Sequence, residues 1–305
     1  MLADLHVHTT ASDGTDSPEE VVVRAVSAGL GALAIADHDT LDGILPAMEE
    51  GQRRGLEVLP AIELGTEFNG QEIHLLGYLI DVACTDFQAE LAYFRRTRRE
   101  RVTRMIGRLN KLGFPITLER VLEIAGPGSV GRPHIARAMV ETGRVQSVEE
   151  AFNFYIGEGK PGFMPRFKYT PARAVRLVRL AGGVAVLAHP GLAQADDLIQ
   201  SLIPEGLQGV EVYHPGHTPE AIEHYRRLCE QYGLVATGGS DYHGAESQKH
   251  NRLGACTVPC RVVEQIKALA GINNDFKEDR YATGWAFEGT GVRNFQRDGE
   301  SKKTG

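Results

Sequence analysis

The chain has 305 residues, of which 42% are hydrophobic and 24% charged, as in an ordinary soluble globular enzyme. A formal net charge of −7 argues against a protein that coats nucleic acid, but it leaves room for a local basic site. No apolar run approaches the roughly 20 residues that a membrane span needs. The four scattered cysteines indicate reduced thiols, and the start MLADLHVHTT does not resemble a signal peptide, so we expect a cytoplasmic protein.

Short apolar runs alternate with amphipathic segments up to about residue 80. Ser17 is placed to cap a helix that has Pro18 at its first position and ends at Gly29 and Gly31. The continuous apolar run at 32–36 suits a parallel strand that is buried on both faces. Further strands are predicted at 2–7, 56–63 and 72–79, and a second helix at 41–54.

Residues 86–168 break this alternation. The pattern predicts a long helix over 86–112, two more helices after Gly113 and a stretch at 157–165 punctuated by glycine and proline. We therefore expect an inserted helical subdomain that caps the substrate. The long helix is rich in arginine, and its arginines are either a solvated face or in part the lining of a route for an anionic substrate: Arg95, Arg96, Arg98, Arg99, Arg101, Arg104 and Arg108.

The first pattern returns from Thr170 onward. Strands are predicted at 184–188, 209–213 and 234–237, and helices at 171–181, from 190 to about 203, at 219–232 and at 262–270. Alternating strands and helices predict right-handed βαβ units and a parallel sheet, and about seven strands suggest a closed or nearly closed barrel. The predicted organisation is a discontinuous barrel over 1–85 and 169–275, the insertion over 86–168 and a loose tail over 276–305.

Histidines and carboxylates fall where the predicted strands end. Because the C-terminal ends of barrel strands meet at one mouth, we expect these side chains to converge. Histidine and carboxylate ligands without cysteine suit Mn²⁺, Fe²⁺ or Zn²⁺, and their number fits two to three divalent ions that share a bridging carboxylate. The predicted metal ligands are His6, His8, Asp13, His38, Glu63, His74, His189, Asp241 and His243.

Each of these residues also has an ordinary structural interpretation. A single histidine at a strand end is most often hydrogen-bonded and structural, and HxH alone is a weak signal. An aspartate after a strand is often a helix N-cap, which is the interpretation we prefer for Asp39 and keep open for Asp37. The conjunction of such residues on successive strands is what favours a metal site.

The motifs resemble those of the polymerase and histidinol phosphatase (PHP) superfamily. The matching strings are Asp4-Leu5-His6-Val7-His8 with Ser12-Asp13-Gly14, Ala36-Asp37-His38-Asp39-Thr40, Ile62-Glu63, His74, Ala188-His189-Pro190 and Gly239-Ser240-Asp241-Tyr242-His243. The resemblance implies an α/β fold, a distorted (β/α)7 TIM-like barrel with three metals at its mouth. It also implies the grouping of ligands: one metal on His6, His8, Glu63 and Asp241, a second on Glu63, His74 and His189, and a third on Asp13, His38 and His243.

Within that superfamily the chain resembles stand-alone bacterial members that are 3′,5′-nucleoside bisphosphate phosphatases or 5′–3′ oligoribonucleases. Gly131-Arg132-Pro133-His134-Ile135-Ala136 matches a string of that group, in which Arg132 and His134 would hold substrate phosphate; the alternative is an ordinary helix start. Lys160, Arg166 and Lys168 could face the mouth and bind substrate as well. His214 is a candidate leaving-group acid, and His217 is expected at the surface.

The function implied is hydrolysis of a nucleotide phosphate ester by a metal-bridging hydroxide. The substrate would be a 3′,5′-nucleoside bisphosphate or a short 5′-phosphorylated oligonucleotide, without a long duplex, a membrane or an obligate protein partner. Three alternatives stay open: a small-metabolite phosphatase of the histidinol-phosphatase kind, an amidohydrolase-type metal hydrolase, and a non-catalytic nucleotide-binding protein.

Overall fold

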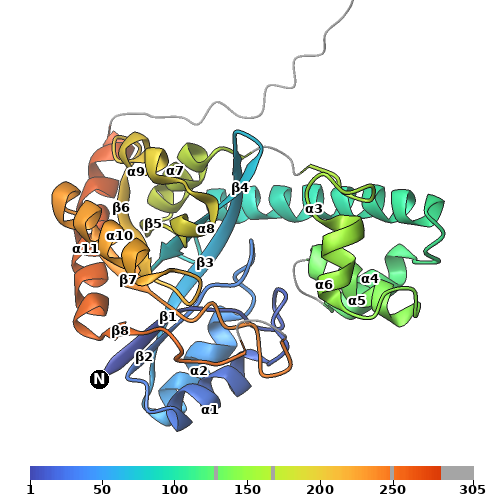
Figure 1. The fold of residues 1–305 in the computed structure, drawn as a ribbon. Coiled ribbons are helices and arrows are strands. Elements are labelled where there is room, and N and C mark those ends of the chain that lie inside the picture. Colours follow the sequence, from blue (N-terminus) through green and yellow to red (C-terminus); the bar gives the residue numbers. More distant parts are fainter. Residues whose placement is uncertain (127–129, 166–168, 248–250, 283–305) are drawn as a thin grey trace, which may run out of the picture.

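The computed structural model describes residues 1–126, 130–165, 169–247 and 251–282, with side chains up to residue 271. Its centre is an eight-stranded sheet with the order β7-β6-β5-β4-β3-β2-β1-β8. A bridge between Val7 and Tyr242 joins the segment after β7 to the end of β1, so the sheet forms a nearly closed barrel (Figure 1). The strands are β1 (Leu2–Val7), β2 (Ala32–Ile35), β3 (Glu57–Phe68), β4 (Gln71–Tyr78), β5 (Val184–Leu187), β6 (Leu207–Tyr213), β7 (Val235–Gly238) and β8 (Val258–Pro259).

The predicted distorted barrel with a helical insertion is confirmed, but the expectation of a parallel sheet is wrong for two strands. β4 runs antiparallel to both β3 and β5, and the short β8 runs antiparallel to β1. The cause lies in Asn69 and Gly70, whose φ angles of 51° and 87° close a tight turn between β3 and β4. Such an Asn-Gly pair between two apolar runs is a hairpin signal, and it turns the chain back on itself. β3 also runs to Phe68, so Glu63 lies within this strand and not at its end.

Helices cover the outside of the barrel. Ser17 caps the first of them, as predicted, and forms a reciprocal capping box with Glu20, while Thr170 and Thr218 each cap a helix that begins with proline. The final helix continues past residue 276, so the first part of the predicted tail is helical, and the rest of that tail lies outside the described residues. The barrel helices are α1 (Pro18–Ser27), α2 (Ile44–Arg54), α7 (Pro171–Leu180), α8 (Pro190–Ala193), α9 (Asp196–Leu202), α10 (Pro219–Tyr232) and α11 (Arg261–Ala282).

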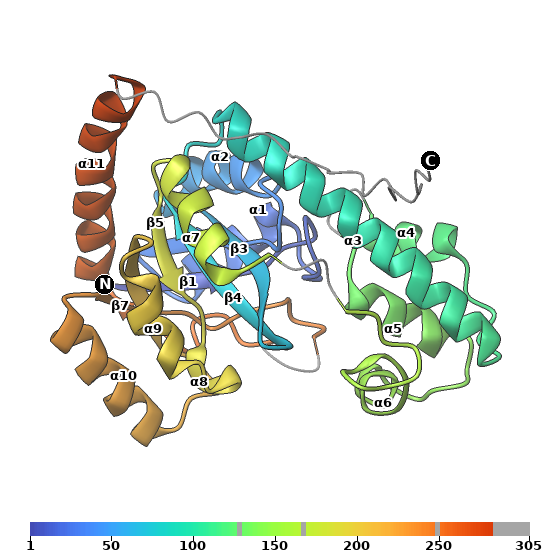
Figure 2. The ribbon, with the colours of Figure 1, turned by 90° about the horizontal axis from the view of Figure 1, so that it is seen from above.

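The insertion stands beside the barrel, and its described part consists of helices joined by loops, without a strand (Figures 1 and 2). It contains α3 (Thr85–Lys111), α4 (Leu118–Ala125), α5 (Arg132–Glu141), α6 (Val148–Ala151) and the π-helical turn η1 (Phe152–Ile156). It has a hydrophobic cluster of its own, in which Leu109 and Met139 are fully buried. The predicted boundary at residue 168 lies outside the described residues.

Small and medium apolar side chains fill the barrel. Alternate residues such as Ala32 and Ala34 of β2 and Val184 and Val186 of β5 belong to one buried cluster, against which Ile266 of α11 packs. Because side chains alternate along a strand, the two residues of each pair lie on one face of their strand. Within the described chain, no helix combines the length and the apolar composition that crossing a membrane requires.

Candidate metal centre

The predicted ligands come together at one mouth of the barrel. His6 and His8 leave the same side of β1, Glu63 comes from β3 and His74 from β4, while the others lie in loops after strands. Because β4 is antiparallel, His74 reaches this mouth from near the start of its strand. Three groups have ligand atoms within 4.8 Å of one another: His8, Asp13, His38 and His243; His6, His8 and Asp241; and His38, Glu63 and His74.

Glu63 lies at the middle of the cluster and is almost fully buried, with 1% of its surface exposed. Its Oε1 is 2.7 Å from His74 Nδ1 and 3.1 Å from His189 Nε2. Its Oε2 faces a second set of ring nitrogens: His38 Nδ1 at 3.0 Å, His8 Nε2 at 3.3 Å and His6 Nε2 at 3.4 Å. One carboxylate that faces five imidazoles in this way has the position of a bridging ligand.

The donor set fits bound cations. His6 Nε2 and His8 Nε2 lie 3.1 Å apart, and Asp241 Oδ1 is 3.5 Å and 3.2 Å from them. His38 Nδ1 lies 3.0 Å from Glu63 Oε2 and yet makes no hydrogen bond within the described residues. Ring nitrogens and carboxylate oxygens that converge at such distances are arranged as neighbouring ligands of one cation.

Electrostatics point the same way. Burial raises the pKa of Glu63, but the charges of His74, His38 and His6 outweigh burial and hold this pKa well below its usual range. Burial also acts against protonation of His8, yet its bonds to Asp241 and Glu63 raise its pKa to about 10. The neighbouring His38, with its ring centroid 4.7 Å from that of His8, has its pKa lowered to about 3, mainly by burial. Adjacent imidazoles therefore cannot all be protonated together, and a bound cation would supply the missing positive charge.

Glu211 supports the cluster from the middle of β6, and the sequence analysis missed it. It is fully buried, with Oε1 2.9 Å from His6 Nδ1 and Oε2 accepting a 2.9 Å bond from the backbone N–H of His189. The bond to His6 Nδ1 places a proton there and leaves Nε2 free to bind a metal. The signal in the sequence was a lone carboxylate between Val210 and Val212 in an apolar strand.

His214 also acts on a ligand. The backbone N–H of Gly216 donates to His214 Nδ1 at 3.0 Å, so the ring proton lies on Nε2, 3.3 Å from Asp241 Oδ2. His214 is buried and contacts Asp241, a predicted metal ligand. His217 is buried too, against the expectation of a surface position: its Nε2 accepts from the N–H of Gly191, and its Nδ1 lies 2.9 Å from the carbonyl of Val212.

The two aspartates beside His38 do not cap α2, so their N-cap interpretation is wrong. The N-cap of α2 is Gly43, which makes no side-chain capping bond. Asp37 instead accepts hydrogen bonds from Thr9 and Ser12 and so fixes the loop that carries Asp13. Asp39 accepts from Arg98 Nε of the insertion at 2.5 Å.

Two of the predicted metal ligands hold a backbone conformation that is costly for residues other than glycine. His189 has φ 28° and Asp241 has φ 53°, both in the left-handed range. Strain of this kind persists where the surrounding structure enforces it, and it is common at functional sites. Here the bond from His189 N–H to Glu211 is one contact that enforces it.

A cavity of about 120 Å³, here called the metal-side cavity, opens over the cluster. Asp13, His38 and His74 line its floor, and the arginines that line its walls are Arg98, Arg101 and Arg132. Of the arginine-rich helix, Arg98 and Arg101 are half-buried, whereas Arg95, Arg96, Arg99, Arg104 and Arg108 are exposed. The helix thus has both a solvated face and a face toward the cluster.

The other predicted substrate contacts vary in position. Arg132 pairs with Glu72 and has its guanidinium 5.5 Å from the ring centroid of Phe152. His134 is buried, and its Nδ1 accepts from the N–H of Gly131, which closes the start of α5 as the helix-start alternative implied. Lys160 is exposed and does not line the metal-side cavity, while Arg166 and Lys168 lie outside the described residues.

Comparison with known proteins places this geometry in a family. The PHP domain model matches residues 4–121. The 5′–3′ exoribonuclease Rnm of Escherichia coli K12 is 36% identical over 250 residues, which cover 80% of this chain and 85% of that protein. The chain belongs to the PHP family. A 3′,5′-nucleoside bisphosphate phosphatase of Chromobacterium violaceum, another relative, is 32% identical over 246 residues, covering 79% of this chain and 86% of that one.

A solved structure agrees with this fold over most of the chain. It is a candidate metal-dependent phosphoesterase from Bifidobacterium adolescentis, with a TM-score of 0.82 and 32% identity, covering 88% of this chain and 96% of that one. The predicted family is confirmed. The PHP domain match ends at residue 121, before His189, Asp241 and His243, which only the fold brings to the other ligands.

Proposed function

We propose that this PHP protein hydrolyses a phosphate ester of a nucleotide, either a 3′,5′-nucleoside bisphosphate or a short 5′-phosphorylated oligonucleotide. The observation that carries the proposal is the cluster of histidines and carboxylates beneath a cavity walled by Arg98, Arg101 and Arg132. Metal-dependent phosphoester hydrolysis follows from the family, and the names of two relatives support a nucleotide as substrate.

The proposed cofactors are two to three divalent cations, with Mn²⁺, Fe²⁺ and Zn²⁺ the metals that suit these ligands. The three convergent groups would hold them, with Glu63 shared between positions and His189 completing the set around its Oε1. When bound, such cations supply Lewis acidity: they lower the pKa of water and offset charge on both the attacking and the leaving oxygen of a phosphoryl group.

The residues of the chain itself position the substrate. Arg98 and Arg101 come from α3 and Arg132 from the start of α5, so the cavity is cationic on the insertion side and lined with ligands on the barrel side. Guanidinium groups suit phosphate because they donate two parallel hydrogen bonds. A phosphoryl group between the two walls would be held and its equatorial charge stabilised.

His214 is proposed here as a positioning residue and not as the leaving-group acid predicted from sequence. Its Nε2–H faces Asp241, and its Nδ1 is occupied by the N–H of Gly216, so both ring nitrogens are used inside the protein. A histidine in this arrangement fixes the orientation of a metal-binding carboxylate.

The rival amidohydrolase interpretation expects a lysine at the bridging position. Here that position is held by the carboxylate of Glu63, which faces His74 and His189 through one oxygen and His38 through the other. We also propose a cytoplasmic location, which the free state of all four cysteines supports. Neither the proposed hydrolysis nor the proposed location requires a protein partner.

The test is a panel of phosphoesters offered to the purified protein with Mn²⁺: 3′,5′-adenosine bisphosphate, a 5′-phosphorylated tetraribonucleotide and histidinol phosphate. We expect metal-dependent release of phosphate or of mononucleotide from one of the first two. Turnover of histidinol phosphate alone would replace the nucleotide by a small metabolite. Binding of nucleotide without turnover of any compound would favour the non-catalytic alternative.

A further inference from the structure

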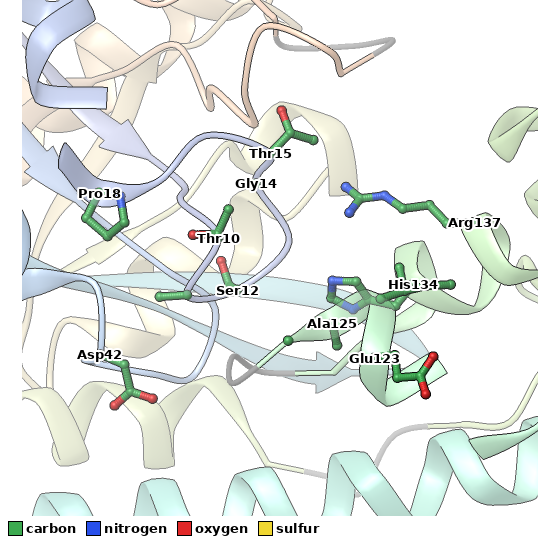
Figure 3. A pocket seen from close by; sticks show the side chains of 13 residues that line it. Thr10, Ser12, Gly14, Thr15, Pro18, Asp42, Glu123, Ala125, His134 and Arg137 are labelled. Carbon is green, nitrogen blue, oxygen red and sulfur yellow. The ribbon is translucent and has the colours of Figure 1, made fainter. Parts of the chain in front are cut away.

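A second and larger cavity lies beside the metal centre. It measures about 450 Å³, and we call it the flank cavity. The loop between β1 and α1 forms one wall, with Thr10, Ser12 and Thr15, and the end of α4 and the N-terminal part of α5 form the other, with Ala125 and Arg137 (Figure 3). It is therefore a space between the barrel and the insertion.

The flank cavity adjoins the metal-side cavity along two elements. Asp13 lines the metal-side cavity, while its chain neighbours Ser12 and Gly14 line the flank cavity. At the start of α5, Pro133 lines the first and His134 the second. The loop at Ser12–Gly14 and the start of α5 therefore separate the two cavities as a shared wall.

The walls favour a neutral group with both apolar faces and hydrogen-bonding edges. Pro18, Ile124 and Ala125 supply apolar surface, and the hydroxyl of Thr15 is buried without a hydrogen-bond partner among the described residues. Arg137 is the one cation among the lining residues, and its Nη2 donates to the carbonyl of Asp13 at 2.9 Å. In Figure 3 the guanidinium points toward the loop across the open space.

Two carboxylates make the flank cavity electrostatically unfavourable for a second phosphate group. Asp42 and Glu123 both line the flank cavity and carry negative charge there, although each pairs with an arginine: Asp42 with Arg95 at 3.1 Å and Glu123 with Arg120 at 2.8 Å. Carboxylates accept hydrogen bonds from sugar hydroxyls and base amino groups, but they repel phosphate. A volume of about 450 Å³ lies within the range of about 300–1,000 Å³ typical of small-ligand sites.

We propose that the flank cavity binds the sugar and base of the nucleotide whose phosphate lies over the metal cluster. The proposal rests on the proposed function for the class of ligand, since the lining residues by themselves suit any neutral, partly apolar group of about this size. It makes the loop at Thr10–Thr15 a shared wall, with Asp13 on the phosphate side and its neighbours on the nucleoside side.

Filling the flank cavity tests the proposal. Thr10 is exposed, and its backbone N–H, which donates to the carbonyl of Asp16 at 2.9 Å, is kept in Thr10→Trp. Glu123→Trp fills the space from the opposite, exposed wall and guards against a local fault of the first variant. Ser27→Trp, at an exposed position that lines neither cavity, is the matched control.

The measurement is calorimetric binding of adenosine 5′-monophosphate and of inorganic phosphate to each protein loaded with Mn²⁺. We expect both filling variants to lose about tenfold or more in affinity for the nucleotide and less than about twofold for phosphate, with the control unchanged. Unchanged nucleotide affinity, an equal loss for both ligands, or no preference of the wild type for the nucleotide over phosphate would overturn the proposal.

Binding and turnover separate this inference from the proposed function. Selective nucleotide binding through the flank cavity without hydrolysis of any phosphoester would overturn the function and leave the cavity assignment in place. Nucleotide hydrolysis that is insensitive to both filling variants would overturn the cavity assignment and leave the proposed function in place.

Discussion

Replacing Glu211 by glutamine tests whether the metal centre depends on a residue that binds no metal itself. Glu211 is fully buried and accepts from two donors, His6 Nδ1 and the backbone N–H of His189. Gln has nearly the same shape but only one acceptor oxygen, so its NH₂ group must face one of these donors. His6 then loses the charged partner that fixes its proton on Nδ1.

The expected cost follows from the bonds that are lost. A hydrogen bond to a charged group contributes about 1.5–3 kcal/mol, and about 1.4 kcal/mol corresponds to a tenfold change in a binding constant. We therefore expect Glu211→Gln to weaken Mn²⁺ binding by about 10–100-fold, the range usual for residues that orient metal ligands. Turnover at limiting Mn²⁺ should fall with the affinity, and excess Mn²⁺ should restore part of it.

The assay is a titration of the metal-free protein with Mn²⁺ in competition with a chromophoric chelator. Glu205→Gln is the matched control, because Glu205 pairs with Arg176 at the surface just before β6. Equal Mn²⁺ affinity in the wild type and Glu211→Gln would refute the positioning role of Glu211, as would a loss of the same size in Glu205→Gln.

Three further predictions concern single side chains. Asp13→Asn should lower the Mn²⁺ occupancy measured by elemental analysis, with a loss of affinity beyond about 100-fold at one position, because it removes a ligand and not merely its support. Burial lowers the pKa of His134 to about 4 in the folded protein, so the unfolded chain binds more protons between about pH 4 and 6.5; acidification from pH 7 to 4 should then cost the wild type on the order of 3 kcal/mol more unfolding free energy than His134→Gln in urea titrations. Leu109→Ala should destabilise the insertion by about 2–5 kcal/mol. Hydrogen exchange should then be faster than in the wild type in α3 to α5 and unchanged in the barrel. Exchange in α3 to α5 that is equally slow in the wild type and the variant would count against a separate core.

The strands and helices of the barrel could be predicted from the sequence because the spacing of apolar residues indicates which positions are buried. The apolar runs of β2 and β5, the Ser17 cap and the prolines at helix starts depend on local chemistry that the chain carries with it. The direction of β4 was predicted wrongly because the alternation of apolar and polar residues is the same in both strand directions. The Asn69-Gly70 turn is the feature that decides the direction. His74 was placed at the mouth although the assumed strand direction was wrong.

Most ligand candidates could be found for the same reason, since they end or follow strands, whereas Glu63 and His74 lie within theirs. The residues that orient them were not, because their contacts are made at a distance in sequence: Glu211 and His6 are 205 positions apart. His214 was noticed, but its tautomer depends on the N–H of Gly216, and spacing cannot show that bond. The flank cavity depends on how the insertion lies against the loop at Thr10–Thr15, which no local pattern encodes.

The most direct test of the metal centre is phosphate release from 3′,5′-adenosine bisphosphate by chelator-treated protein, before and after Mn²⁺ is added back, in the wild type and in His38→Ala. His38 belongs to two of the three convergent ligand groups, so its loss cannot be made good by the other residues. We predict no release after chelation, recovery with Mn²⁺ in the wild type and none in His38→Ala. Release that survives chelation, or recovery in His38→Ala equal to that of the wild type, would contradict a metal-dependent phosphoesterase at this site.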